Sequence, residues 1–156
     1  VRATVVSHAL APVTLKTLEG SEFYLSTLPT HQAVLIFFDV NCSHCTKDIP
    51  LWLEMYEQSR TRDVTILGIT TGANREDVSE YVRKNNLQSP VLLDQRQELF
   101  TQLRISATPT KVLCSSDWRI LQVWEGRTTQ RSHQSDLGGM YAFLGIEPDQ
   151  LPLDLK

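Results

Sequence analysis

Two cysteines three positions apart constrain the fold of this chain more than any other feature. Cys42 and Cys45 stand just past residues 33–38, a continuous apolar run of strand length. After the cysteines, apolar side chains in residues 49–56 follow the i, i+3, i+4, i+7 spacing of an amphipathic helix. A Cys-x-x-Cys pair at the junction of a buried strand and a helix is typical of a redox-active pair.

The two cysteines are expected to differ in reactivity. At a helix N-terminus, unpaired backbone N–H groups and the positive end of the helix dipole favour a thiolate over a thiol. Cys42 is therefore the candidate nucleophile. Cys45 lies one turn into the helix, within reach of a short disulfide with Cys42, and is the candidate resolving thiol. Because the chemistry belongs to the two sulfurs, no organic cofactor is expected beyond this redox-active disulfide.

Length and charge limit the classes of partner. The 156 residues suit a single domain, with a core over about residues 12–144 and a loose tail over residues 147–156. A net charge of −3 gives no reason to expect nucleic acid or an anionic membrane surface as a partner. No apolar run is long enough to span a membrane. The chain begins at Val1 rather than Met, which is compatible with the removal of a signal or a membrane tether.

Apolar patterns predict an alternation of strands and helices. The first hairpin turns at Glu19 and Gly20, and Asn74, with Asp77 three residues on, starts a helix. Pro50 is expected to kink the helix that follows the cysteines. Strands are expected at residues 12–16, 22–25, 33–38, 64–70, 90–93, 110–114 and 119–124, and further helices at residues 74–86, 99–103 and 137–144.

This order resembles that of thioredoxin-superfamily proteins. The strand leading into Cys42-Ser43-His44-Cys45, Pro50 eight residues after the first cysteine, and the segment 105–110 carry the resemblance. The N-terminal hairpin, the strand and helix inserted between residues 74 and 103, and Asp48 with Ile49 and Pro50 are more similar to the TlpA-like and ResA-like subgroup. The resemblance implies an α/β fold with a central mixed sheet flanked by helices. It also implies an exported protein, in the bacterial periplasm or anchored to a membrane facing it.

Two residues near the cysteines have predicted supporting roles. His44 lies between them, where an imidazolium or ring N–H would stabilise the Cys42 thiolate; alternatively, it is an exposed histidine with no special effect. Asp48 is three residues after Cys45, on the same helix face. In the TlpA-like subgroup an acid at this position, usually glutamate, is associated with proton transfer at the second cysteine; alternatively, Asp48 only favours an early helical turn. Thioredoxin itself has a buried acid at the place of Ile36.

The resemblance assigns substrate binding to a second segment. Pro109 matches the family's cis-proline, which would present the backbone of Thr108 to an extended substrate across from Cys42. A trans proline that begins an ordinary strand is the alternative. Asn41 stands where the family commonly has tryptophan, which should leave the sulfur more open and alter the docking surface. Cys114 is expected to pack in the core as a small apolar residue.

These features predict a thiol-disulfide oxidoreductase that acts on protein disulfides or dithiols, as a reductant, together with a redox partner that resets the pair. A thiol peroxidase is one alternative, although Asp39 stands three residues before Cys42, where peroxiredoxins need threonine. A copper- or zinc-binding carrier using Cys42, Cys45 and a histidine is another. Four-ligand sites usually need a second cysteine pair, and Cys114 is the only other cysteine, so no metal site is assigned.

Overall fold

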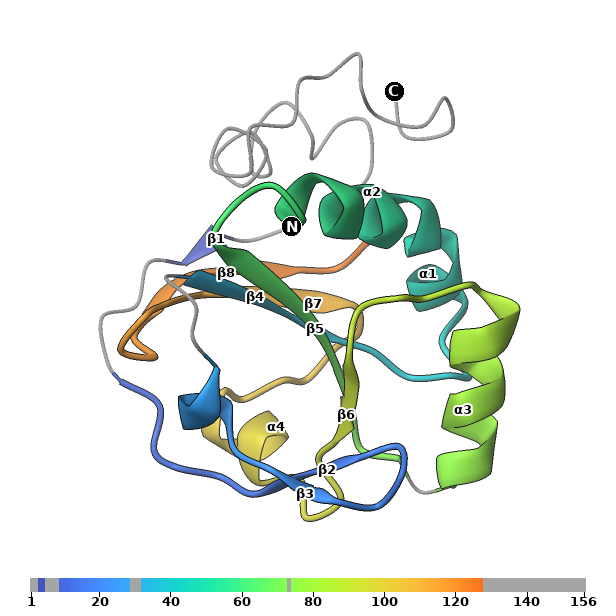
Figure 1. Ribbon diagram of the computed structural model, residues 1–156, viewed down its shortest axis with the longest axis horizontal. Helices are drawn as coiled ribbons and strands as arrows, with labels where there is room; N and C mark the ends of the chain where they lie inside the picture. Colours follow the sequence, from blue (N-terminus) through green and yellow to red (C-terminus); the bar gives the residue numbers. More distant parts are fainter. Residues whose placement is uncertain (1–2, 5–8, 29–31, 73, 128–156) are drawn as a thin grey trace.

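The described part of the chain forms one eight-stranded mixed sheet with helices on both faces (Figure 1). The computed structural model describes residues 3–4, 9–28, 32–72 and 74–127. The strand order is β1-β8-β7-β4-β5-β6-β2-β3. The strands are β1 (Ala3–Thr4), β2 (Leu15–Thr17), β3 (Glu22–Phe23), β4 (Gln32–Phe37), β5 (Val64–Thr70), β6 (Val91–Leu93), β7 (Thr110–Ser115) and β8 (Ile120–Glu125).

Parallel strands form the centre of the sheet. β4 pairs with β5 and β5 with β6 in parallel, whereas β7 pairs with β4 in antiparallel orientation. Parallel pairs need crossover connections, and helices supply them here. In β4 five of the six residues are buried, as expected of a strand covered on both faces. The predicted mixed sheet is confirmed. The helices are η1 (Leu25–Thr27), α1 (Ser43–Lys47), α2 (Ile49–Ser59), α3 (Arg75–Lys84) and α4 (Glu98–Gln102).

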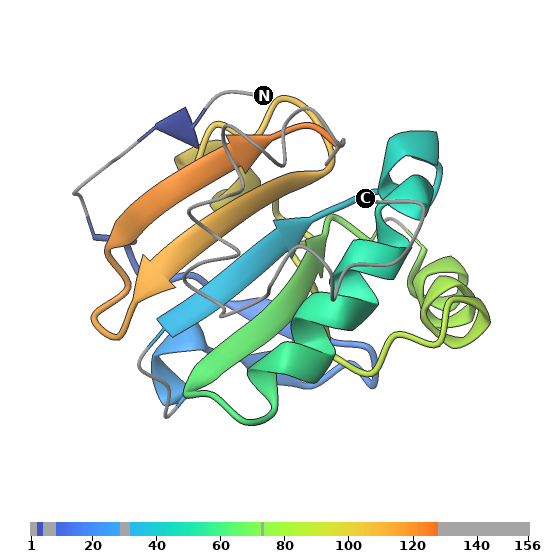
Figure 2. The same cartoon turned by 90° about the horizontal axis from the view of Figure 1, so that it is seen from above.

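The sheet separates two apolar cores. Helices α1, α2 and α3 cover one face, and α4 covers the other (Figures 1 and 2). Side chains of β4 alternate between the two cores, with Ile36 on the α1–α3 side and Leu35 on the α4 side. Trp52 of α2 packs so closely on Gly68 of β5 that a Cβ there would lie 2.6 Å from the indole ring. Glycine at this position therefore lets the helix approach the sheet.

The cysteine-bearing helix is broken one turn after Cys45. α1 ends at Lys47 and α2 begins at Ile49, and Asp48 between them has φ −86° and ψ −5°. Pro50 lies in the first turn of α2, where a missing N–H breaks no intrahelical hydrogen bond. The predicted kink is present, but it precedes the proline instead of interrupting a continuous helix.

Most other expected elements are found near their predicted positions. β2 and β3 form the N-terminal hairpin, whose turn includes Gly20 at φ +94°. The Asn74 side chain accepts a hydrogen bond from the Glu76 N–H at 3.0 Å and caps α3. β1, which pairs with β8 at one edge, was not predicted. The expected helix at residues 137–144 and the tail at residues 147–156 lie outside the described residues. Among the helices described, none has the length and apolar character needed to cross a membrane.

Candidate active site

Cys42 is the N-cap residue of α1, just beyond the end of the central strand β4. Its sulfur accepts a hydrogen bond from the backbone N–H of Cys45 at 3.3 Å, and its thiol donates to the carbonyl oxygen of Thr108 at 3.4 Å. Asp39 shapes the loop before it: its carbonyl oxygen accepts from the Cys42 N–H at 3.1 Å, and its carboxylate accepts from the Asn41 N–H at 2.7 Å. The Cys42 sulfur is therefore held in a fixed, half-buried position.

The surroundings of Cys42 favour its thiolate. Burial by itself raises the pKa of this thiol, but hydrogen bonds with the side chains of Cys45 and Thr108 and with the backbone of Cys45 and His44 outweigh that effect. The net result is a pKa below the ordinary value of cysteine. The activated thiol expected at the start of this helix is thus present.

Cys45 has the opposite character. Its side chain is buried, and burial raises the pKa of its thiol to about 12. Both cysteines are free thiols in this structure. At neutral pH the pair consists of an activated, accessible thiol and a protonated, buried one, which is the division of roles that sequential disulfide exchange requires.

The segment before β7 faces the cysteines. The Thr108–Pro109 peptide bond is cis, Pro109 is buried and Thr108 is half-buried. The Thr108 side chain lowers the pKa of Cys45 as well as that of Cys42, although burial dominates at Cys45. The Gly126 N–H donates to the Pro109 carbonyl oxygen at 2.8 Å and ties the end of β8 to this segment. The structure therefore brings Thr108, predicted from the sequence, to the cysteine pair.

His44 and Asn41 are both exposed beside the nucleophile. The effect of His44 on the Cys42 pKa comes from its backbone N–H. The predicted effect of the imidazole ring is untested and stays a prediction. The predicted part of Asn41 in substrate binding also stays a prediction.

Asp48 lies beneath the helix and is not a surface carboxylate. Its side chain makes no capping hydrogen bond to α2, and its Oδ2 accepts a hydrogen bond from Nζ of Lys111 at 2.5 Å. Lys111 lies on β7, two residues after Pro109, and is 1% exposed. Sequence reasoning missed Lys111. The sequence did contain a signal: Lys111 is the single lysine in this segment, and its apolar neighbours indicate a buried strand.

Tyr81 of α3 is a second residue that sequence reasoning placed only on an apolar helix face. Its hydroxyl lies 3.4 Å from the Thr46 hydroxyl, and its ring stacks on Phe38 with centroids 5.5 Å apart. Burial raises the pKa of Tyr81, and the charges of Cys45, Cys42 and Asp39 add to that increase. Tyr81 is therefore a neutral hydroxyl close to the cysteine pair.

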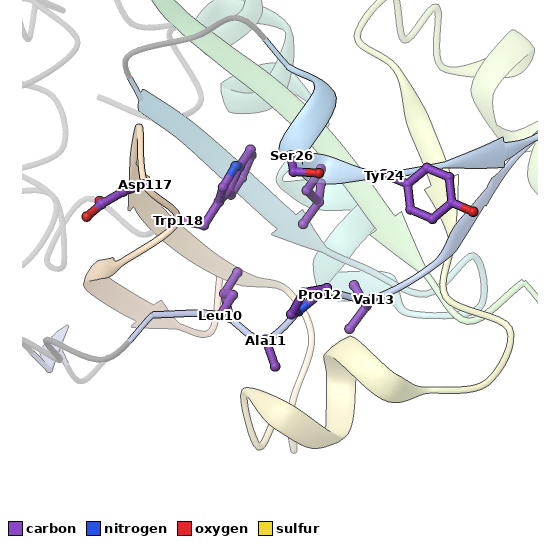
Figure 3. Close-up of a pocket in the computed structure, with 9 residues that line it drawn as sticks. Leu10, Ala11, Pro12, Val13, Tyr24, Ser26, Asp117 and Trp118 are labelled. Carbon is purple, nitrogen blue, oxygen red and sulfur yellow. The ribbon is translucent and has the colours of Figure 1, made fainter.

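One hollow adjoins the cysteine loop, lined by residues 39–41, 70–72, Asn74, Asp77 and Val78, and another lies away from the cysteines. The hollow in Figure 3, of about 120 Å³, is lined by residues 10–13 and 24–26 with Asp117 and Trp118, and contains none of the predicted site residues. In the portion of the chain that the structure describes, no three His, Cys, Asp or Glu side chains are grouped so that they could hold a metal ion.

The fold and the cysteine pair together define a thioredoxin-like redox protein. The AhpC/TSA family model matches residues 6–128. The chain belongs to the AhpC/TSA family.

Several curated relatives of the chain carry the same name. The chain is 22% identical over 135 residues to "Thiol-disulfide oxidoreductase ResA" of Geobacillus kaustophilus (strain HTA426), covering 86% of this chain and 78% of the relative. It is 23% identical over 116 residues to the ResA of Bacillus subtilis (strain 168), covering 74% of this chain and 65% of the relative. The chain thus spans somewhat less than two thirds of the second relative.

Solved structures share the fold over most of the chain. A putative thiol:disulfide interchange protein DsbE from Chlorobium tepidum has a TM-score of 0.76 at 14% identity, covering 91% of this chain and 98% of that one. Peroxidoxin BcpB from Mycobacterium tuberculosis has a TM-score of 0.74 at 17% identity, covering 90% and 96%. At these identities the likeness shows the fold alone.

Proposed function

We propose that the chain catalyses thiol–disulfide exchange with protein substrates, using Cys42 as the nucleophile and Cys45 as the resolving thiol. The observation that carries the proposal is the contrast between the two sulfurs, one turn apart on α1. The pKa of Cys42 is lowered, and that of Cys45 is raised to about 12. The ResA relatives support the same class of activity.

The reaction has two steps. The Cys42 thiolate attacks one sulfur of a substrate disulfide, forming a mixed disulfide and releasing the other substrate sulfur as a thiolate. Cys45 then loses its proton and attacks Cys42, so that the bond to the substrate breaks and its second sulfur leaves as a thiolate. The substrate gains two electrons, and Cys42 and Cys45 become a disulfide. The two sulfurs carry these electrons, so the reaction needs no organic cofactor.

Proton transfer at Cys45 is assigned to Asp48. A thiol with a pKa of about 12 is almost entirely protonated at neutral pH, so the second step benefits from a base. Asp48 follows Cys45 by one turn, and its backbone N–H donates to the Cys45 carbonyl oxygen at 3.1 Å. Both side chains are buried on the same side of the sheet.

Substrate binding is assigned to the rim of the site. The Thr108 carbonyl oxygen lies 3.4 Å from the Cys42 sulfur, so a substrate whose sulfur reaches Cys42 passes beside this backbone. Main-chain pairing there would bind extended segments with little dependence on their sequence. Asn41, exposed directly before Cys42 in the chain, would contribute a polar contact.

The physiological direction is proposed to be reduction of substrate disulfides outside the cytoplasm. This rests on the resemblance to the TlpA-like subgroup. In this setting a redox partner must return the Cys42–Cys45 disulfide to the dithiol after each turnover. A tether in a longer product would keep the domain at the membrane.

Trapping the mixed disulfide tests the proposal. The Cys45→Ser variant, incubated with a small disulfide-containing protein such as insulin, should accumulate a covalent adduct at Cys42 that mass spectrometry detects and dithiothreitol releases. The Cys42→Ser variant is the control and should form no adduct. Absence of an adduct with Cys45→Ser would rule out exchange through Cys42.

A thiol peroxidase is the second candidate because a peroxidoxin shares the fold over 90% of this chain. The loop before Cys42 does not favour it, since Asp39 uses its carboxylate to hold the Asn41 N–H. Rapid consumption of hydrogen peroxide by the Cys45→Ser variant, faster than its reaction with disulfides, would move this candidate to first place.

A further inference from the structure

A buried ion pair lies beneath the cysteine helix. The carboxylate of Asp48, between α1 and α2, and the ammonium group of Lys111 on β7 are 2.5 Å apart, with side chains 6% and 2% exposed. The ion pairs Lys16–Glu22 and Arg83–Glu80 have exposed side chains by contrast. Burying an ammonium and a carboxylate costs free energy that a close pair only partly recovers, so such a pair commonly serves a purpose beyond stability.

The pair connects the two halves of the active site. Lys111 pairs across the sheet with Ile36 of β4, the place where the resemblance to thioredoxin puts a buried acid. The acid here comes from the helix, one turn after Cys45, and its cation comes from the strand that follows Thr108 and Pro109. The buried charges thus lie on the same face of the sheet as the acid that the resemblance places at Ile36. Here, however, the α1–α2 junction and β7 supply them instead of β4.

Few other ionisable groups share this core. Lys111 has the apolar neighbours Ile36 on β4 and Trp124 on β8, and the buried side chains of α2 carry no charge. Among the described residues of the α1–α3 core, the titratable groups besides the pair are Cys45 with Cys42 beside it on α1, Tyr56 on α2 and Tyr81 on α3. Of these groups, Cys45 is the one that has to lose a proton during exchange.

We propose that Lys111 is a positioning residue for the resolving step: its charge keeps Asp48 ionised in the buried site, so that Asp48 can accept the proton of Cys45. The inference rests on the proposed function. A carboxylate buried without a cation takes up a proton, and a protonated carboxyl cannot act as a base. Lys111 therefore acts through Asp48 and does not touch the reacting sulfurs.

In the resolving step, one proton and one electron pair leave the Cys45 thiol. The Cys45 S–H proton passes to the Asp48 carboxylate, directly or through one water, and the sulfur's electron pair forms the bond to Cys42. The Cys42–substrate bond breaks, and the substrate sulfur leaves with its electron pair. Lys111 stays an ammonium throughout, and Asp48 returns its proton to solvent before the next turnover.

The resolving step can be observed alone with 5,5′-dithiobis(2-nitrobenzoate). Cys42 releases one coloured thiolate as it forms the mixed disulfide, and attack by Cys45 releases the second. We expect Asp48→Asn to slow the second release about a hundredfold near pH 7, the lower end of typical general-base effects. Lys111→Met should slow it about tenfold and move its pH profile to higher pH, because more of the Asp48 carboxyl is then protonated.

Three further variants separate this role from a purely structural one. Lys47→Met removes an exposed positive charge from the same helix and should leave the second release unchanged. Lys111→Arg keeps the charge and should keep the wild-type pH profile. The double variant Asp48→Asn/Lys111→Met buries no charge, so its thermal stability should exceed that of either single variant, yet its second release should stay as slow as that of Asp48→Asn.

The outcomes are distinct. A wild-type pH profile in Lys111→Met would overturn the proposal, and so would a wild-type rate in the double variant, which would show that the pair only joins the helix to the sheet. Lys111→Gln, which also removes the charge, takes the same test if Lys111→Met does not fold. If the wild-type protein itself releases only one coloured thiolate for its Cys42–Cys45 pair, the proposed exchange function fails, whatever the result for Lys111.

Discussion

Cys45 and Cys114 are two buried thiols on opposite faces of the same sheet. Burial raises the pKa of both to about 12. At Cys114 burial is the sole cause, and its neighbours are apolar side chains of the α4 core. At Cys45 the Cys42 and Thr108 side chains also act on the thiol, and the Asp48–Lys111 pair lies on the same side of the sheet.

The difference shows what separates a reactive buried cysteine from an inert one. Burial alone gives a protonated thiol with little nucleophilic character, which suits the packing role predicted for Cys114. The same burial is compatible with reactivity at Cys45 because a second thiol lies one turn away and the carboxyl group of Asp48, paired with Lys111, follows in the next turn. The polar groups around Cys45, more than the burial of its thiol, therefore distinguish it from the inert Cys114.

The largest expected effect comes from removing the Cys45 thiol, and removal of the Cys114 thiol is the matched control. Cys45→Ser should abolish catalytic turnover with a protein disulfide and leave a trapped adduct, because nothing else resolves the mixed disulfide. Cys114→Ala, on the other face, should keep wild-type turnover. Insulin reduction followed by turbidity measures both. Comparable losses of turnover in the two variants would show that Cys45 and Cys114 do not differ in function.

The ion pair gives the next largest effect. Asp48→Asn leaves a buried ammonium without its carboxylate and should lower the free energy of unfolding by about 3–5 kcal/mol. In the double variant with Lys111→Met the loss should be much smaller, because no uncompensated charge remains. Urea denaturation measures both values. Additive losses in the double variant would mean that the two side chains do not stabilise each other.

Alkaline pH should destabilise the protein through both buried thiols. Because the folded-state pKa of each lies above its unfolded value, their contribution is complete below about pH 9 and is lost as the pH rises towards about 12. Cys114→Ala should therefore lose less stability than the wild-type protein between pH 8 and 10.5, a range set by the ordinary thiol pKa of about 8.5. If the free energy of unfolding of the two proteins changes with pH in parallel, ionisation of Cys114 does not destabilise the folded state.

The smallest effect is expected from the imidazole of His44. His44→Ala keeps the backbone N–H that acts on Cys42, so the pKa of Cys42 should rise only slightly. The pH dependence of Cys42 alkylation by iodoacetamide measures it. An unchanged curve would remove the ring from the mechanism, and a much larger shift would make the ring a principal source of activation.

Local patterns predicted much of the fold and half of the site. The apolar run before Cys42 and the helical spacing after Cys45 place both thiols correctly, because strand, loop and helix start are set by neighbouring residues. Asn74 was likewise recognised as a helix cap. The contact between Asp48 and Lys111 joins residues 63 positions apart, and nothing local pairs them. The lysine inside β7 was visible, but its partner depends on how the broken helix lies on the sheet.

The reduction potential of the Cys42–Cys45 pair tests whether the two thiols form a reversible redox couple. The protein is equilibrated in glutathione or dithiothreitol redox buffers, and the free thiols are counted by alkylation in a Cys114→Ala background. We expect one reversible two-electron couple near the potential of thioredoxin, about −270 mV, as suits a reductant. A potential near about −120 mV would reverse the proposed direction. The absence of any reversible couple would contradict thiol–disulfide exchange altogether.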